Sequence, residues 1–192
     1  YIEMKIDKAS FADRRKKLME QMGTSGLAII PAARMMKRNS DVEHAFRQDS
    51  DFYYLTGFNE PDAILVLIPG RQEGEVVLFC RDRDPLMEIW NGYRAGPEGA
   101  VNDYGAAEAY AVDDIDDRLP KLLNGIERIY YSIGQDEKLD QRVRGWLNTI
   151  RGQARQGAVA PTQLVMLDHI LHEMRLFKSS EEQALMHRAG QI

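Results

Sequence analysis

The stretch that decides the fold is RQDSDFYYLTGFNEPDAILVLI, residues 47–68. Residues 52–55 (FYYL) form an aromatic run of the kind that favours β-strands. Residues 63–68 (AILVLI) form a continuous apolar run, which is typical of a strand buried on both faces. We therefore predict two adjacent strands at the centre of a sheet, joined by a short polar turn, with Tyr53 and Leu65 side by side.

The chain before this stretch predicts a helix and a short strand. Ser10 is a residue type that caps helices, and a helix beginning there places Phe11 and Leu18 on one apolar face, with Arg14 away from it. Residues 27–30 (LAII) then predict a short buried strand, which Pro31 closes.

The chain after the central stretch alternates strands and helices. We predict strands at residues 75–80, 108–112 and 128–133, and helices at residues 96–105, 113–123 and 136–150 and from Ser180 onward. The remaining segments predict a long surface loop at residues 32–45, a strand end or loop at 88–93, and turns with short helix at 163–177. Because hairpin-connected strands come first and helix-alternating strands later, we expect an α/β fold, a mixed sheet of about five or six strands flanked by helices.

Composition excludes several classes of function. A formal net charge of −5 leaves no basic surface for nucleic acid. No apolar run approaches the ~20 residues that a membrane-spanning helix needs, and the N-terminal residues lack the apolar core of a signal peptide. The one cysteine, Cys80, cannot form an internal disulfide, which fits a reducing compartment. We therefore expect a cytoplasmic protein without nucleic-acid or membrane partners.

The residues give no complete catalytic centre. His169 and His172 are three apart and could share a helix face, but no histidine has the spacing of a known zinc motif, so a solvated helix face is the simpler interpretation. The acidic cluster at residues 113–117 reads as a solvated helix N-terminus. Cys80 lies in an apolar strand, where a thiol usually serves packing. We predict no catalytic residue and no metal ligand in this chain.

Two strings carry a family resemblance. RQDSDFYYLTGFNEP at residues 47–61 resembles the hallmark of the N-terminal, creatinase-like domain of Xaa-Pro aminopeptidases (aminopeptidase P, peptidase family M24), and HEMRLFKS at residues 172–179 is similar to the family's junction with the catalytic domain. The resemblance implies a ribonuclease H-like sheet. It divides the chain into an N-terminal extension at residues 1–9, the domain at residues 10–178, and the start of a linker helix at residues 179–192.

The resemblance also implies where the chemistry lies. Proteins of this family place catalysis in a following "pita-bread" domain, in which two divalent ions, commonly Mn²⁺, activate a hydroxide that hydrolyses the bond between the first residue and a proline at position two. The full protein would then be a metalloprotease acting on such peptides and a homo-oligomer, dimer or tetramer, while this chain alone would be inactive. A prolidase or creatinase relative and a non-catalytic interaction module are the alternatives.

Three residues match family positions that help to close the active site, also between subunits. Asp41 lies in the predicted long loop, Trp90 in the EIWNGY segment and Arg155 in the RGQARQG loop. The resemblance implies that Trp90 stacks on an apolar or prolyl side chain, and that Asp41 and Arg155 form an ion pair or hold peptide termini. Taken alone, a lone tryptophan is more often a packing residue, and lone charged loop residues are usually solvated.

Overall fold

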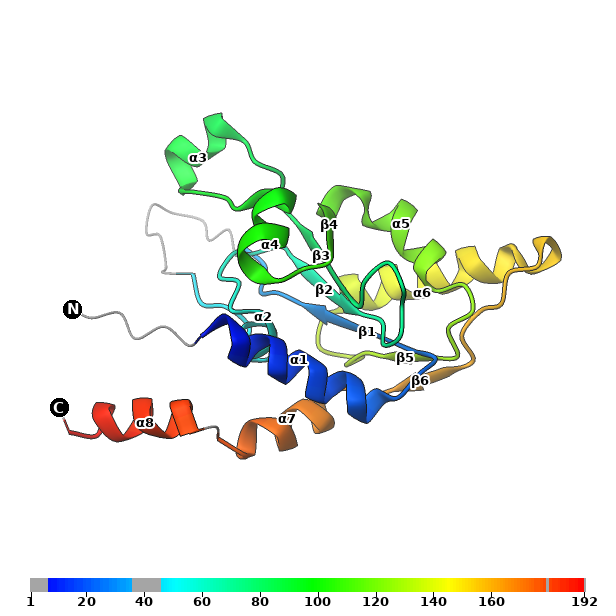
Figure 1. Cartoon of the computed structure of the whole chain (residues 1–192). Coiled ribbons are helices and arrows are strands. Elements are labelled where there is room, and N and C mark those ends of the chain that lie inside the picture. Colours follow the sequence, from blue (N-terminus) through cyan, green and yellow to red (C-terminus); the bar gives the residue numbers. More distant parts are fainter. Residues whose placement is uncertain (1–6, 36–45, 179, 192) are drawn as a thin grey trace.

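The computed structural model describes residues 7–35, 46–178 and 180–191, and within them a mixed sheet lies between two layers of helices (Figure 1). The strand order is β4-β3-β2-β1-β5-β6. Strand β2 runs antiparallel to both β1 and β3, and the other neighbouring pairs are parallel. The strands are β1 Gly26–Pro31, β2 Ile64–Leu67, β3 Val76–Cys80, β4 Glu108–Ala111, β5 Arg128–Tyr130 and β6 Gln163–Val165. The predicted fold class is therefore confirmed.

Alternate residues of the central strands enter two separate cores. Ala28 and Ile30 of β1 face one core with the helices α1, α2, α4 and α7, whereas Leu27 and Ile29 face the other with α5 and α6. The helices are α1 Lys8–Met22, α2 Ser50–Thr56, α3 Pro85–Asn91, α4 Gly96–Tyr104, α5 Ile115–Leu122, α6 Glu137–Gly152, α7 Asp168–Leu176 and α8 Ser180–Ala189, with short 3₁₀ turns η1 Val112–Asp114 and η2 Ala154–Gln156. The period-two pattern of a strand explains this division, because successive side chains point to opposite faces.

The predicted aromatic strand at residues 52–55 is wrong, because these residues form helix α2. The Asp49 side chain caps it by accepting hydrogen bonds from the N–H groups of Asp51 (3.0 Å) and Phe52 (2.9 Å). Gly57 ends it in the left-handed conformation, at φ 65°. Tyr53 is therefore on a helix surface and not beside Leu65. Local capping at both ends, together with tertiary burial of Phe52, outweighs the β-propensity of the aromatic run.

The sixth strand comes from a segment predicted as turns and short helix. Strand β6 (Gln163–Val165) pairs with β5 in parallel, and only Val165 of its residues is partly buried. An edge strand this short and this exposed has no hydrophobic run to announce it. The segment at residues 88–93, predicted as a strand end or loop, instead lies largely in helix α3.

Two further details differ from the prediction. Helix α1 begins at Lys8, and Asp7 rather than Ser10 caps it by accepting from the N–H of Ala9 (3.4 Å). Arg14, predicted to face solvent, is buried, because its guanidinium donates to the Tyr54 carbonyl oxygen (3.0 Å) and pairs with Glu182 of α8 (2.6 Å). Most of the predicted loop at residues 32–45 lies outside the described residues. In the part of the chain that the structure describes, no helix has the length and hydropathy needed to cross a membrane.

Candidate functional site

The most exposed apolar surface described in the chain is an excursion between β3 and α4, residues 81–95, which we call the α3 excursion. In Figure 1 it projects beyond the sheet and the other helices. Helix α3, every residue of which the structure describes, has no buried residue. Its apolar side chains are mostly in solvent, with exposed fractions of 75% for Leu86, 75% for Ile89 and 82% for Trp90. Exposed apolar groups gathered in this way mark an interaction surface.

The helix in the excursion forms because both of its ends are well capped. Asp84 accepts from the N–H groups of Leu86 (3.1 Å) and Met87 (3.2 Å), and Pro85 occupies the first turn, where its missing N–H costs nothing. Gly92 ends the helix at φ 87°. These local signals form α3 although none of its residues is buried.

Glu88 ties the outer part of the excursion together. Its carboxylate accepts from the N–H of Arg94 (2.8 Å) and pairs with the Arg83 guanidinium (3.2 Å). The backbone hydrogen bond from Arg94, followed by Arg83, lowers the pKa of Glu88. Arg83 also lies over the Tyr93 ring, 5.2 Å from its centroid.

Glu60 ties the base of the excursion to the domain. One carboxylate oxygen accepts from the Arg81 guanidinium (3.4 Å), and the other accepts from the N–H of Ala95 (2.9 Å). One carboxylate thus contacts the first and the last residue of the excursion. Next to this base is a cavity of about 340 Å³, lined by Arg81, Asp82, Arg83, Asp84, Pro85, Arg94, Ala111, Val112 and Asp113.

Of the three residues predicted for the site, the structure describes Trp90 and Arg155, and these two do not meet within one chain. Trp90 is on the α3 excursion, and Arg155 is exposed in η2, which follows α6 at the opposite end of the molecule from α3 in Figure 1. Asp41 lies outside the described residues.

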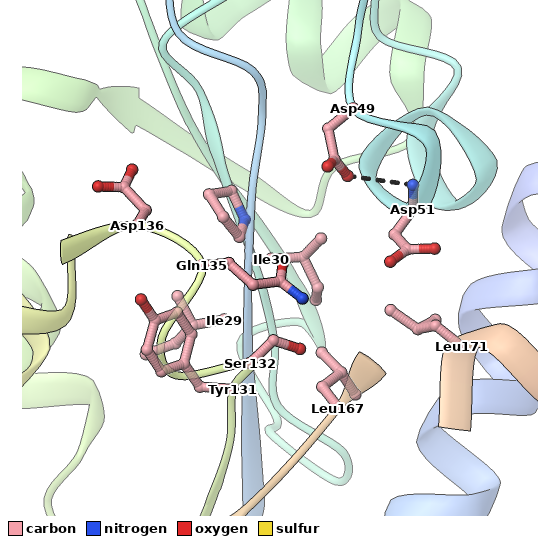
Figure 2. A pocket seen from close by; sticks show the side chains of 11 residues that line it. Ile29, Ile30, Asp49, Asp51, Tyr131, Ser132, Gln135, Asp136, Leu167 and Leu171 are labelled. Atoms are coloured by element: carbon pink, nitrogen blue, oxygen red, sulfur yellow. Dashed lines mark hydrogen bonds between the residues drawn. The ribbon is translucent and has the colours of Figure 1, made fainter. Parts of the chain in front are cut away.

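A second, smaller cavity of about 40 Å³ lies where β1 and β5 end. Figure 2 shows Asp136 on one side of it and Asp49 and Asp51 on the other. These carboxylates already have partners: Asp49 caps α2, Asp51 pairs with Arg175 (3.0 Å), and Asp136 pairs with Arg34 (3.0 Å). Burial raises the pKa of Asp51, while Arg175 opposes the shift. The cavity is too small for a peptide, and its polar groups join loops to helices.

The other candidate groups are structural. His169 pairs only with the neighbouring exposed Glu173 of α7 (3.4 Å). Asp113 and Asp114 are exposed in η1, as predicted for a solvated helix start. Cys80 is fully buried, and burial raises the pKa of its thiol to about 12. Among the residues that the structure describes, no three acidic, cysteine or histidine side chains are placed to hold a metal ion.

Comparison with known proteins gives the family. The family described as "Aminopeptidase P, N-terminal domain" matches residues 11–130. The chain belongs to this aminopeptidase P N-terminal domain family. It is 42% identical over 97% of its length to the Xaa-Pro aminopeptidase of Escherichia coli (strain K12). It superimposes with a TM-score of 0.92 on the structure of aminopeptidase PepP of Pseudomonas aeruginosa, at 54% identity over 95% of this chain.

The aminopeptidase P N-terminal domain makes up less than half of these relatives. The chain spans 43% of the E. coli protein and 41% of the P. aeruginosa one. A further similar structure is titled as the zinc-substituted E. coli aminopeptidase P in complex with product, with a TM-score of 0.91 at 41% identity, over 97% of this chain and 43% of that one. The resemblance based on the two sequence strings is thus confirmed.

The two glutamates that hold the excursion, Glu60 and Glu88, are not predicted from the sequence. Glu60 stands inside the family string at residues 47–61, where the sequence predicts only a turn. The RDRD segment at residues 81–84 carries two arginines and two aspartates, so its charge pattern alone does not point to an outside carboxylate. Which carboxylate it meets depends on the pairing of β2 with β3, and that pairing is tertiary.

Proposed function

We propose that this domain shapes the active-site entrance of an Xaa-Pro aminopeptidase whose catalytic residues lie outside this chain. The longer protein would remove the first residue from peptides that have proline at position two. The observation that carries the proposal is 42% identity to an Xaa-Pro aminopeptidase along nearly the whole of this chain, which accounts for only 43% of that relative. We place the longer protein in the cytoplasm.

The described residues of this chain do not fit the metal ions that such a reaction uses. The carboxylates and histidines of the described residues do not converge on one point. We therefore assign the divalent ions, two Mn²⁺ by the family resemblance, to polypeptide outside this chain, where a metal would supply an activated water at neutral pH.

Within this chain, Trp90 and Arg155 contact substrate in the proposal, and Asp41 completes the entrance. The exposed indole of Trp90 offers a flat face for a prolyl or apolar side chain. Arg155 offers a guanidinium to a peptide carboxylate or to Asp41 of another subunit. Because Trp90 and Arg155 are on different sides of the chain, their joint use requires a homo-oligomer, a dimer or a tetramer.

A non-catalytic interaction module is the second candidate, and the exposed apolar side chains of α3 favour it. An activity assay separates the two. Both the 192-residue chain and the longer protein are incubated with Mn²⁺ and an Xaa-Pro tripeptide. We expect no turnover by the chain alone and turnover by the longer protein. Turnover by the chain alone would contradict the assignment of chemistry, and an inactive longer protein would favour the interaction module.

The same assay addresses prolidase and creatinase relatives. An Ala-Pro dipeptide replaces the tripeptide, with the enzyme and metal concentrations unchanged. We expect the tripeptide to be cleaved with the higher kcat/KM, whereas a protein that cleaves only the dipeptide is a prolidase.

A further inference from the structure

We infer that Glu60 is a positioning residue, which fixes the α3 excursion and thereby the orientation of Trp90. The inference rests on the proposed function, because it assigns Glu60 to the aminopeptidase reaction through Trp90. It also has a consequence for the 192-residue chain alone, the order of Trp90, which can be measured without any activity.

Helix α3 has no buried apolar side chain to fix its orientation. All residues of α3 are described, and none is buried. A cavity lined largely by charged side chains lies next to the base of the excursion. A segment without buried apolar contacts belongs to the least stable part of a fold. The one buried residue of the excursion is Ala95 at its base, so the contacts that orient α3 itself are polar.

Two glutamates, Glu88 and Glu60, make polar contacts with the excursion, and they join different parts of it. Glu88 joins residues that all belong to the excursion, so it stiffens the excursion without orienting it. Glu60 lies outside the excursion, before β2, and bonds to both Arg81 and Ala95. The first and last residues of the excursion are thus held to each other and to the segment before β2 through one carboxylate.

The contacts of Glu60 with Arg81 and Ala95 are partly shielded from water. The side chains of Glu60 and Arg81 are only 13% and 15% exposed, so water screens their ion pair less than it would on the surface. The bond from the Ala95 N–H to a charged acceptor is also stronger than a neutral one. Gly96 follows directly at φ 68°, and a Cβ there would come within 2.7 Å of Arg83 Cγ, so the chain has little room to shift at this end.

The test in the 192-residue chain uses its two tryptophans. The chain is labelled with 5-fluorotryptophan and studied by ¹⁹F NMR, where Trp90 reports the excursion and the buried Trp146 is an internal control for folding. In Glu60→Ala we expect the Trp90 signal to narrow and to move toward the position of free fluorotryptophan, with the Trp146 signal unchanged.

Glu60→Gln keeps an acceptor for Ala95 but loses the charge, so its shift should be smaller, and Arg81→Gln should resemble it. Glu20→Ala, an exposed glutamate on α1, is the matched control.

A Trp90 signal that stays at the wild-type position in Glu60→Gln, Arg81→Gln and Glu60→Ala would overturn the inference. If Glu60→Ala unfolds the chain, the Trp146 signal moves as well, and the two milder variants then decide the matter.

The test in the longer protein is a double-mutant cycle. We expect Glu60→Gln to lower kcat/KM on the order of tenfold by misplacing Trp90. In a Trp90→Ala background the same change should have no further effect, because its route to the substrate is gone. Additive losses would show that Glu60 acts by general stability instead. If Trp90→Ala alone leaves kcat/KM unchanged, the substrate contact proposed for Trp90 fails, and the ¹⁹F result still decides whether Glu60 orients the excursion.

Discussion

At the scale of single residues, Asp49 decides that residues 50–56 form a helix. Its side chain accepts two backbone N–H groups of the first turn of α2. Replacing it by alanine leaves those donors without a partner, and we expect Asp49→Ala to lower the free energy of unfolding by about 1 kcal/mol. Asparagine caps helices about as well as aspartate, so Asp49→Asn should stay close to wild type. Urea unfolding followed by far-UV circular dichroism measures both, and equal losses in the two variants would show that the carboxylate acts by charge rather than as a cap.

At the scale of elements, α3 and α2 are helices of the same length with opposite roles. Helix α2 buries Phe52 and Leu55, whereas α3 buries nothing. We expect the triple variant Leu86→Gln, Ile89→Gln, Trp90→Gln to change the free energy of unfolding by less than about 0.5 kcal/mol, and Leu55→Ala to lower it by about 2–5 kcal/mol. Denaturant titration of the 192-residue chain compares them. A loss in the triple variant similar to that of Leu55→Ala would mean that α3 packs against its own domain and is not a surface kept free for substrate or another subunit.

At the scale of the whole molecule, Cys80 reports the cooperative opening of the domain. It is fully buried in β3, and burial raises the pKa of its thiol from 9.0 to about 12. A raised pKa means that the folded state holds this proton more tightly, so the resulting stabilisation is complete below pH 9 and is lost as the pH rises from about 9 to 12. We expect a thiol reagent to leave the native chain unlabelled at pH 8 and to label it fully in urea. The urea midpoint should also fall more steeply above pH 9 than in Cys80→Ala. Rapid labelling of the native chain at pH 8 would contradict the burial.

The sequence locates Trp90 as a candidate site residue, but it does not predict the contacts that hold the α3 excursion in place. Family context singles out Trp90, and its short aromatic segment, EIWNGY, predicts a strand end or a loop. The capping signals of Asp84, Pro85 and Gly92 were present in the sequence and would have predicted α3. The contact of Glu60 with both ends of the excursion joins residues more than twenty positions apart, and no local pattern encodes it.

The sequence by itself determined the α/β class, the buried strands β1, β2 and β3, most of the helices and the family, because apolar runs, helical spacing and two long family strings are local properties of the chain. Only the tertiary structure decided that the aromatic run at residues 52–55 is a helix and that an exposed segment at residues 163–165 closes the sheet edge. It also decided that Arg14 is buried between Tyr54 and Glu182. For β6 and Arg14 the free energy comes from partners distant in the chain, and for residues 52–55 the burial of Phe52 adds to the local cap by Asp49. These contributions outweigh the local preference.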